Sequence, residues 1–149
     1  MNSMSSTYLS LNVHLIFCTK NRAPVIRRES WPDVHAYLGG VAKTMGATPI
    51  QIGGVEDHVH MLLGYKATHS VSNLAQEIKK VSSNWMKELV PDFAWQVGYA
   101  GLSVSPDGLF EVSNYIRNQE AHHKTMTFKE ERLMLLKLAG IEFDPKYLD

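Results

Sequence analysis

The sequence has little cysteine, no long hydrophobic run and no excess of charge of either sign. Its 149 residues include one cysteine, Cys18, so no internal disulfide can form and a reducing cytosol is the expected compartment. The apolar N-terminal stretch Leu9–Phe17 is interrupted by Asn12 and His14 and follows no positively charged leader. We therefore expect neither a signal peptide nor a membrane span, and a cytoplasmic protein.

Charge is balanced, because 15 Lys and Arg residues stand against 15 Asp and Glu residues. Such balance is not typical of a protein that coats nucleic acid non-specifically, so nucleic-acid binding would depend on local basic patches. One patch gathers near a loop and the other on a predicted helix: Lys20, Arg22, Arg27 and Arg28, then Lys79, Lys80 and Lys87. The length suits one domain with its own core, so residues 1–149 are expected to form a single domain.

Hydrophobic periodicity predicts alternating strands and helices. The expected elements are a strand over 8–20, a helix from about Ser30 (its N-cap) to Gly46, strands over 47–53 and 56–63, a helix from Ser70 or Ser72 to Pro91, and a strand region over 93–104. This β-α-β-β-α-β order predicts an α+β, ferredoxin-like (RRM-like) fold with helices on one face of an antiparallel sheet.

Two further helices are expected after this core. One begins at Ser105–Gly108 and carries Tyr115, and the other begins with the capping box Thr127–Glu130 and ends at Gly140. We expect both helices to be additions to the core fold.

Two histidines are predicted to share one face of the short strand Glu56–Leu63. Because strand side chains repeat with a period of two, His58 and His60 project from the same face and can share one ligand. They would form half of a metal site. An isolated His-x-His pair is more often a pair of satisfied structural histidines, so a second element is needed.

The second element is the segment Tyr115–Gln119, where helical spacing brings Tyr115 and Gln119 to one face. His58, His60 and the amide oxygen of Gln119 would give a divalent ion three neutral ligands and leave positions open for an anionic guest such as phosphate. Tyr115 could then attack the phosphorus and form a covalent phosphotyrosine. Such an intermediate keeps the bond energy, which favours strand transfer over hydrolysis.

The sequence resembles the single-tyrosine HUH transposases, small enzymes of bacterial insertion sequences that mobilise single-stranded DNA, and their repeat-associated relatives. The resemblance follows the order of the chain over nearly its whole length. It is carried by His14-Leu15-Ile16-Phe17 with Thr19-Lys20-Asn21-Arg22, by Asp57-His58-Val59-His60-Met61-Leu62, by Lys79-Lys80-Val81-Ser82-Ser83, by Trp95-Gln96-Val97-Gly98-Tyr99, and by Tyr115-Ile116-Arg117-Asn118-Gln119 with His122-His123.

This resemblance implies that His58, His60 and Gln119 bind Mg²⁺ or Mn²⁺, and that Tyr115 is the nucleophile left attached to a 5′ phosphate beside a free 3′-hydroxyl. It also implies DNA hairpins as partners, and a homodimer in which the tyrosine helix of one subunit can complete the metal site of the other. Nitrogen ligands by themselves favour Zn²⁺ or Mn²⁺ before Mg²⁺.

Four further residues are candidates for DNA binding. Lys79 and Lys80 are expected to contact phosphates and Arg22 to bind DNA, whereas His14 is expected either to touch DNA or to lie beside the site. Two adjacent histidines, at 122 and 123, are expected to be exposed at a helix end, with support of the metal as the alternative.

Two other functions remain open from the sequence. A non-catalytic module for single-stranded nucleic acid would expose aromatic side chains on its sheet. A phosphodiesterase that uses water would keep its activity in Tyr115→Phe. The segments 102–108 and 128–149 resemble the repeat-associated branch, so both transposition of its own element and a domesticated DNA-processing role are compatible with the sequence.

Overall fold

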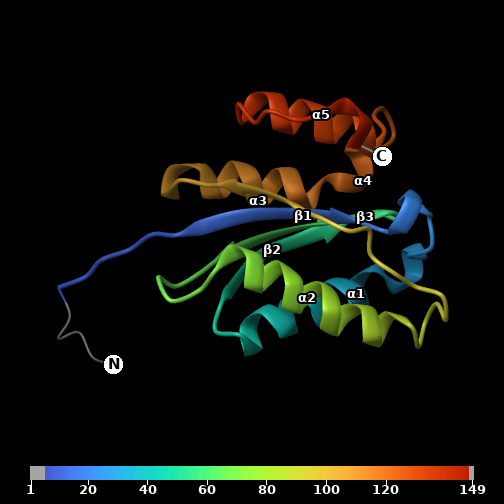
Figure 1. Ribbon diagram of the computed structural model, residues 1–149, viewed down its shortest axis with the longest axis horizontal. Coiled ribbons are helices and arrows are strands. Elements are labelled where there is room, and N and C mark those ends of the chain that lie inside the picture. Colours follow the sequence, from blue (N-terminus) through green and yellow to red (C-terminus); the bar gives the residue numbers. More distant parts are fainter. Residues whose placement is uncertain (1–5, 148–149) are drawn as a thin grey trace.

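A four-stranded antiparallel sheet lies at the centre of the protein, between two layers of helices (Figure 1). The structure is a computed structural model and describes residues 6–147. The strands are β1 (Asn12–Cys18), β2 (Thr48–Gly54), β3 (His58–Gly64) and β4 (Ala100–Ser103), in the sheet order β2-β3-β1-β4. The helices are α1 (Trp31–Thr44), α2 (Val71–Met86), α3 (Leu109–Arg117), α4 (Gln119–His122) and α5 (Phe128–Leu138). The predicted α+β class with an antiparallel sheet is confirmed.

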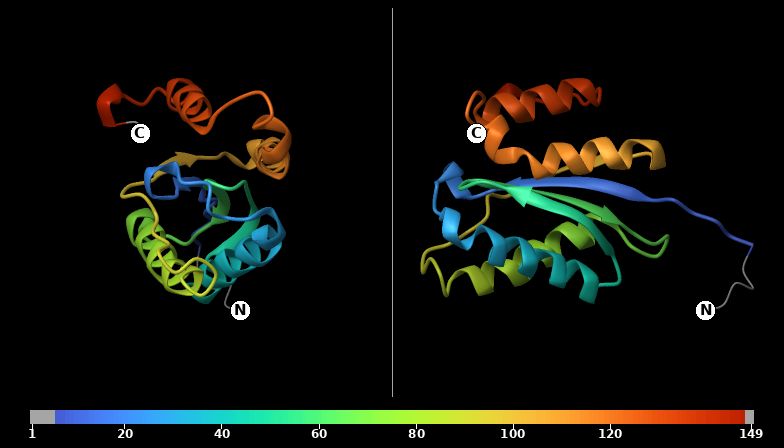
Figure 2. Two further views of the ribbon diagram at one scale, coloured as in Figure 1. Left: turned by 90° about the vertical axis from the view of Figure 1, so that its right-hand side faces the viewer. Right: turned by 180° about the vertical axis from the view of Figure 1, so that it is seen from behind.

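Helices α1 and α2 cover one face of the sheet (Figure 2). Alternate residues of β1 and β3 point toward them and form the main core, with Leu15, Phe17 and Met61 almost fully buried. The two helices also contact each other, since the rings of Tyr37 and Trp85 stack with centroids 4.4 Å apart. This layer is the helical face that the sequence predicts.

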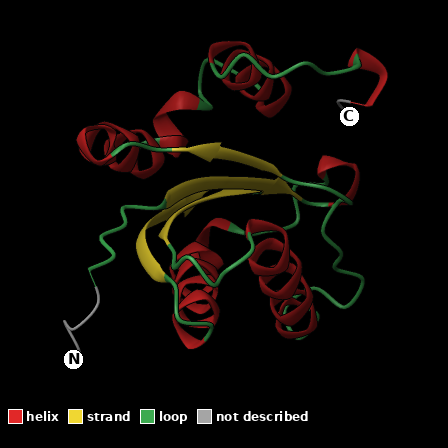
Figure 3. Cartoon of the chain, turned by 60° about the vertical axis from the view of Figure 1, so that its left-hand side comes forward, coloured by secondary structure: helices red, strands yellow, loops and turns green. Residues whose placement is uncertain are grey.

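Helices α3, α4 and α5 lie over the opposite face of the sheet (Figure 3). The other set of alternating residues faces them, and His14, Ile16 and Cys18 of β1 are therefore buried as well. The C-terminal helices are more than additions to the fold, because they enclose the face that carries the histidines. Within the described residues, no helix is both long enough and apolar enough to cross a membrane.

The strand region predicted over 93–104 is wrong in extent, because β4 covers only Ala100–Ser103. Upstream of it, Trp95 makes one isolated bridge to Thr19, and Gly98 takes a left-handed φ of 94° that turns the chain out of the sheet. The ammonium of Lys79 holds this segment by hydrogen bonds to the carbonyl oxygens of Gln96 and Gly98. The segment is therefore a wall beside α2 and not a strand.

Candidate active site

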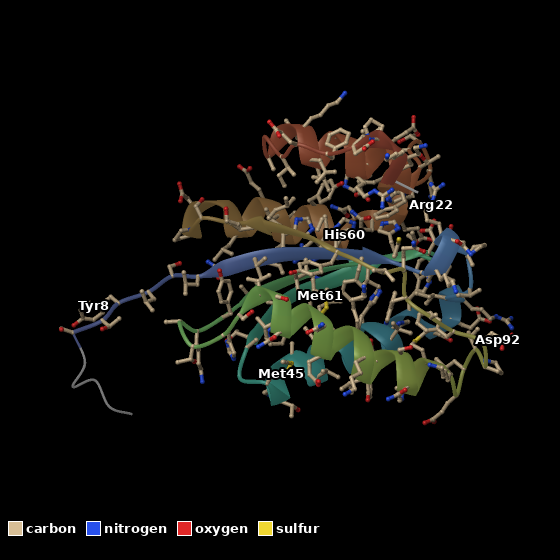
Figure 4. The ribbon with its side chains drawn as sticks, viewed as in Figure 1. Tyr8, Arg22, Met45, His60, Met61 and Asp92 are labelled. Carbon is tan, nitrogen blue, oxygen red and sulfur yellow. The ribbon has the colours of Figure 1, made fainter. Side chains whose placement is uncertain are left out.

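The two histidines of β3 lie between the sheet and the C-terminal helices. Figure 4 shows His60 on the side of α3–α5 and its neighbour Met61 on the side of α1 and α2, as the pleat of a strand requires. His58 and His60 are both 0% exposed. Their rings lie 5.1 Å apart between centroids, so the predicted shared face is present.

Hydrogen bonds orient both imidazoles toward one point. His58 donates from Nδ1 to Asp57 Oδ1 at 2.8 Å and from Nε2 to Gln119 Oε1 at 3.0 Å. His60 directs its Nε2 to Glu131 Oε1 at 3.2 Å, and its Nδ1 lies 2.7 Å from Nε2 of His14. His14 therefore supports His60 from the neighbouring strand, beside the site as the sequence predicts.

Glu131 is the centre of the cluster, although the sequence reasoning missed it. Its carboxylate is 0% exposed and reaches the site from α5. Its Oε1 lies 3.3 Å from Nε2 of His58 and 3.0 Å from Nε2 of His123. Its Oε2 accepts hydrogen bonds from Gln119 Nε2 at 2.9 Å and from the Tyr115 hydroxyl.

These contacts set the charges in the site. Burial by itself would raise the pKa of the Glu131 carboxyl, but hydrogen bonds from His123, His58 and His60 outweigh burial and hold that pKa far below its usual range. Burial lowers the pKa of His58, yet hydrogen bonds to Asp57 and Glu131 overcome it and raise the pKa to about 9. An imidazolium and a carboxylate therefore form a buried pair.

His60 and Tyr115 are neutral in the site. Burial lowers the pKa of His60 to about 4, against the opposing effect of Glu131, so neutral His60 donates from Nε2 and accepts at Nδ1 from His14. Burial and the adjacent Glu131 carboxylate raise the pKa of Tyr115 above its ordinary value. Tyr115 is therefore a neutral phenol in this arrangement.

The donor atoms fit a divalent cation. The ligand atoms of His58, His60 and Glu131 all lie within 4.8 Å of one another. Two imidazole nitrogens and a carboxylate oxygen are a common set for a divalent transition metal. The Gln119 oxygen is adjacent to this group, and Glu131 would bring a negative charge that the expected set of three neutral ligands lacks. The ligand set His58, His60 and Gln119 stays a prediction.

The helix that was expected to carry both Tyr115 and Gln119 is broken between them. Helix α3 ends at Arg117 and α4 begins at Gln119, with Asn118 outside the helical region at φ −99° and ψ 25°. Both side chains still reach Glu131. His123 also enters the cluster, so an exposed position for it is wrong, while the ring of His122 stacks on Tyr115 at 4.6 Å.

Of the predicted DNA-binding residues, His14 lies in this cluster, Arg22 lies at a hollow beside it, and Lys79 and Lys80 lie on α2. Arg22 takes a positive φ of 53° and lines a hollow of about 540 Å³ together with Asp57 and His123. Lys80 is exposed on α2, whereas the ammonium of Lys79 is engaged by two backbone carbonyls. Their contact with DNA stays a prediction.

A signal for Glu131 does exist in the sequence. Glu131 follows Phe128 by three residues and precedes Leu135 by four, so it occupies the face of α5 that is otherwise apolar. A carboxylate in an apolar stripe indicates a buried partner. The adjacent Glu130 forms the predicted capping box with Thr127.

Comparison with known proteins identifies the family of this chain. The sequence matches the family described as "Transposase IS200 like" over residues 7–119. The ISDra2 transposase TnpA of Deinococcus radiodurans is 26% identical over 117 residues, which is 73% of this chain and 84% of that protein. A crystal structure described as that of a transposase from Deinococcus radiodurans is 26% identical with a TM-score of 0.64, over 80% of this chain and 98% of the other.

A second solved structure, a REP-associated tyrosine transposase bound to a REP hairpin, has a TM-score of 0.61 at 13% identity. The alignment covers 83% of this chain and 74% of the other, and the likeness concerns the fold alone. The family match includes β1 to β4, both histidines of β3, Tyr115 and Gln119. This chain belongs to the IS200-like family of transposases.

Proposed function

We propose that this protein nicks single-stranded DNA and transfers strands through a 5′-phosphotyrosine at Tyr115, in a reaction that depends on Mg²⁺ or Mn²⁺. The observation that carries the proposal is the buried cluster in which the Tyr115 hydroxyl, both β3 histidines and Glu131 meet in a chain of this family. We propose one catalytic domain over residues 1–149, a ferredoxin-like core, and action in the cytoplasm.

His58, His60 and Glu131 would hold the ion, with Gln119 as a fourth donor. Once bound, the ion would supply positive charge and Lewis acidity to a phosphodiester. For this, His58 must release its Nε2 proton, because an imidazole binds a metal only in its neutral form. Asp57 keeps the His58 ring oriented through Nδ1 during that exchange.

Tyr115 supplies the nucleophilic oxygen. Its bond to phosphorus forms while the bond from phosphorus to the 3′ oxygen breaks, which leaves a free 3′-hydroxyl and a 5′-phosphotyrosine. Attack by a 3′-hydroxyl on the same phosphorus reverses the step and joins strands. Glu131 Oε2, which already accepts the phenolic hydrogen, is the nearest group that orients this hydroxyl.

The partner we propose is single-stranded DNA with hairpin ends. The family match supports DNA transposition, and a relative of the same fold is described as bound to a REP hairpin. A module that binds nucleic acid on its open sheet is less compatible with this structure, because α1 and α2 cover one face and α3–α5 cover the other. Transposition of its own element and a domesticated role would use the same chemistry.

The test is incubation with labelled single-stranded DNA from the flanks of the gene, with Mg²⁺ or Mn²⁺, followed by denaturing electrophoresis. We expect a DNA–protein band that requires the metal and that Tyr115→Phe abolishes while DNA binding remains. Cleavage without such a band would indicate a phosphodiesterase that uses water. Binding without cleavage, on a substrate with intact hairpins, would indicate a non-catalytic binding module.

A further inference from the structure

A groove runs between α2 and the segment 94–99, outside the active site. Its volume is about 450 Å³. The segment leaves the end of α2 and returns to the sheet at β4 (Figure 1). It contains the motif Trp95–Tyr99, to which the proposed chemistry assigns no task.

The wall of the groove is held in place by α2. The Lys79 ammonium donates to the carbonyl oxygens of Gln96 at 2.6 Å and Gly98 at 2.7 Å. The indole of Trp95 donates to the hydroxyl of Ser82 at 3.0 Å. Charge-assisted bonds of this kind are stronger than neutral ones, so the wall is preorganised in the free protein.

The wall presents apolar side chains to solvent. Val97 is 94% exposed and Tyr99 is 42% exposed. Exposed aromatic side chains beside basic residues are typical of surfaces on which successive bases of a single strand stack. On the other wall, Lys80 of α2 is exposed and Gln76 adds an amide.

The segment that forms this wall also lines a hollow on the side of α5. This second hollow, of about 320 Å³, shares the wall Gln96–Tyr99 and extends to Phe128 and Arg132 of α5. The ring of Phe128 stacks on His58 with centroids 4.2 Å apart. Among the described residues that line either hollow, the charged ones are Lys79, Lys80 and Arg132, and none is Asp or Glu. In a chain with zero net charge, the two hollows together form a basic path along the segment, next to the Phe128 ring that stacks on His58.

We propose that this path holds a single-stranded segment of the DNA substrate. Tyr99 stacks on a base, Lys80 contacts a phosphate, and Lys79 is a positioning residue that holds the wall. The inference rests on the proposed function for its choice of DNA as the ligand. It also changes the role expected for Lys79, whose ammonium already serves two carbonyl groups.

The experiment measures binding of a fluorescein-labelled 20-nucleotide oligo(dT) by anisotropy at several salt concentrations, with Tyr115→Phe as the parent so that no covalent product forms. Adding Tyr99→Ala should weaken binding about 5- to 150-fold, whereas Tyr99→Phe should keep it. Lys80→Ala should reduce the slope of log K against log salt by about 0.7, the value for one phosphate contact on a single strand. Lys79→Ala should weaken binding but leave the slope unchanged.

Lys43→Ala, which removes an exposed charge of α1, is the matched control and should alter neither quantity. Unchanged binding in both Tyr99→Ala and Lys80→Ala would overturn the proposed binding path. The proposed reaction at Tyr115 would be unaffected by that result, provided that the wild-type protein forms its DNA adduct. A parent that binds no oligonucleotide, with a wild type that forms no adduct, would overturn both proposals. Tighter, Tyr99-dependent binding of oligo(U) than of oligo(dT) would assign the groove to RNA and overturn the choice of DNA.

Discussion

At the scale of single residues, one carboxylate links the proposed nucleophile to the two histidines that we propose as metal ligands. Glu131 uses one oxygen for the imidazoles and the other for Tyr115 and Gln119. Within the described residues it is the one carboxylate in the metal-ligand cluster. Removal of the Glu131 carboxylate should therefore lower the affinity for the ion more than removal of any neutral side chain of the cluster would.

We predict that Glu131→Gln weakens Mn²⁺ binding by about tenfold or more, the size of effect seen even when a group outside the ligand shell is lost. The amide has the same shape but no charge. Isothermal titration calorimetry checks this, and thermal unfolding shows that the variant is folded. Glu111→Gln, an exposed change on α3, should bind the ion as the wild type does. Equal affinities in the two variants would remove Glu131 from the metal site.

A second residue gives a prediction about pH. His35 of α1 has a buried Nε2 with no hydrogen-bond partner, and burial lowers its pKa to about 4. The unfolded chain takes up this proton near pH 6.5, so the folded state loses stability as the pH falls from about 6.5 toward 4.

The melting temperature should therefore fall over that range, and His35→Gln should make the fall less steep. The fall will not vanish, because burial also lowers the pKa values of His14 and His60, to about 3 and about 4. If the melting temperature of the variant depends on pH as that of the wild type does, the pKa of His35 is the same in the folded and the unfolded chain. That result would contradict the prediction.

How far the site is predictable depends on the sequence distance between its parts. His58 and His60 follow from the period of a strand, because this relation is local. Helical spacing also predicts that Tyr115 and Gln119 lie near each other, although the helix is broken at Asn118 between them. The role of Glu131 cannot be predicted in this way, because it depends on the packing of α5 over a strand that lies about 70 residues earlier in the chain. Lys79 likewise cannot be assigned from the sequence, because its partners lie in a loop.

At the scale of elements, the approach of α3 to β2 depends on one glycine. A Cβ at Gly53 would lie 2.3 Å from the backbone oxygen of Ile116, the residue after Tyr115. A backbone oxygen cannot move aside to make room for this Cβ, as the end of a flexible side chain could. Gly53 therefore allows the tyrosine helix to lie against the sheet.

Gly53→Ala should push α3 away from β2, lower the stability by about 1–3 kcal/mol and reduce the yield of DNA adduct. Urea unfolding measures the first effect and the denaturing gel the second. Gly40→Ala is the control, because nothing lies within 4 Å of a Cβ there and an alanine in a helix is about 1 kcal/mol more favourable. A Gly53→Ala protein as stable and active as the wild type would show that α3 does not need this close approach.

The elements themselves follow from the sequence where the pattern is long and regular. Helix α2 carries the predicted cap, since the Ser70 side chain accepts from the backbone N–H of Asn73. Ser30 is the N-cap of α1 as expected, but a 3-10 turn precedes the helix and the Ser30 side chain makes no capping bond. The start of β4 was misplaced because apolar residues of the 93–99 segment pack on α2 and Phe17 as a loop.

At the scale of the whole molecule, the two helical layers leave the cluster closed to solvent. His58, His60 and Glu131 are each 0% exposed. Tyr115 is only partly buried, whereas these three side chains are out of reach of a phosphodiester in the described arrangement.

The same arrangement bears on the homodimer that the sequence resemblance implies. One chain brings Tyr115 within hydrogen-bonding distance of a carboxylate that also contacts its own β3 histidines. A second copy is not needed to complete this cluster. We therefore predict that Tyr115 acts on the metal site of its own chain, whether or not two chains associate.

Mixing two inactive variants tests this prediction. Tyr115→Phe lacks the nucleophile, and a variant with His58→Ala and His60→Ala lacks two metal ligands. If each chain completes its own site, the mixture forms no DNA adduct. If tyrosine helices are exchanged within a dimer, half of the dimers are mixed and each has one intact site, so the mixture should recover about a quarter of the wild-type yield.

Wild-type protein diluted with either variant serves as the control for subunit exchange, and light scattering gives the number of chains in each sample. Adduct in the mixture would therefore show that this fold, in its active form, opens and shares its tyrosine helix between subunits.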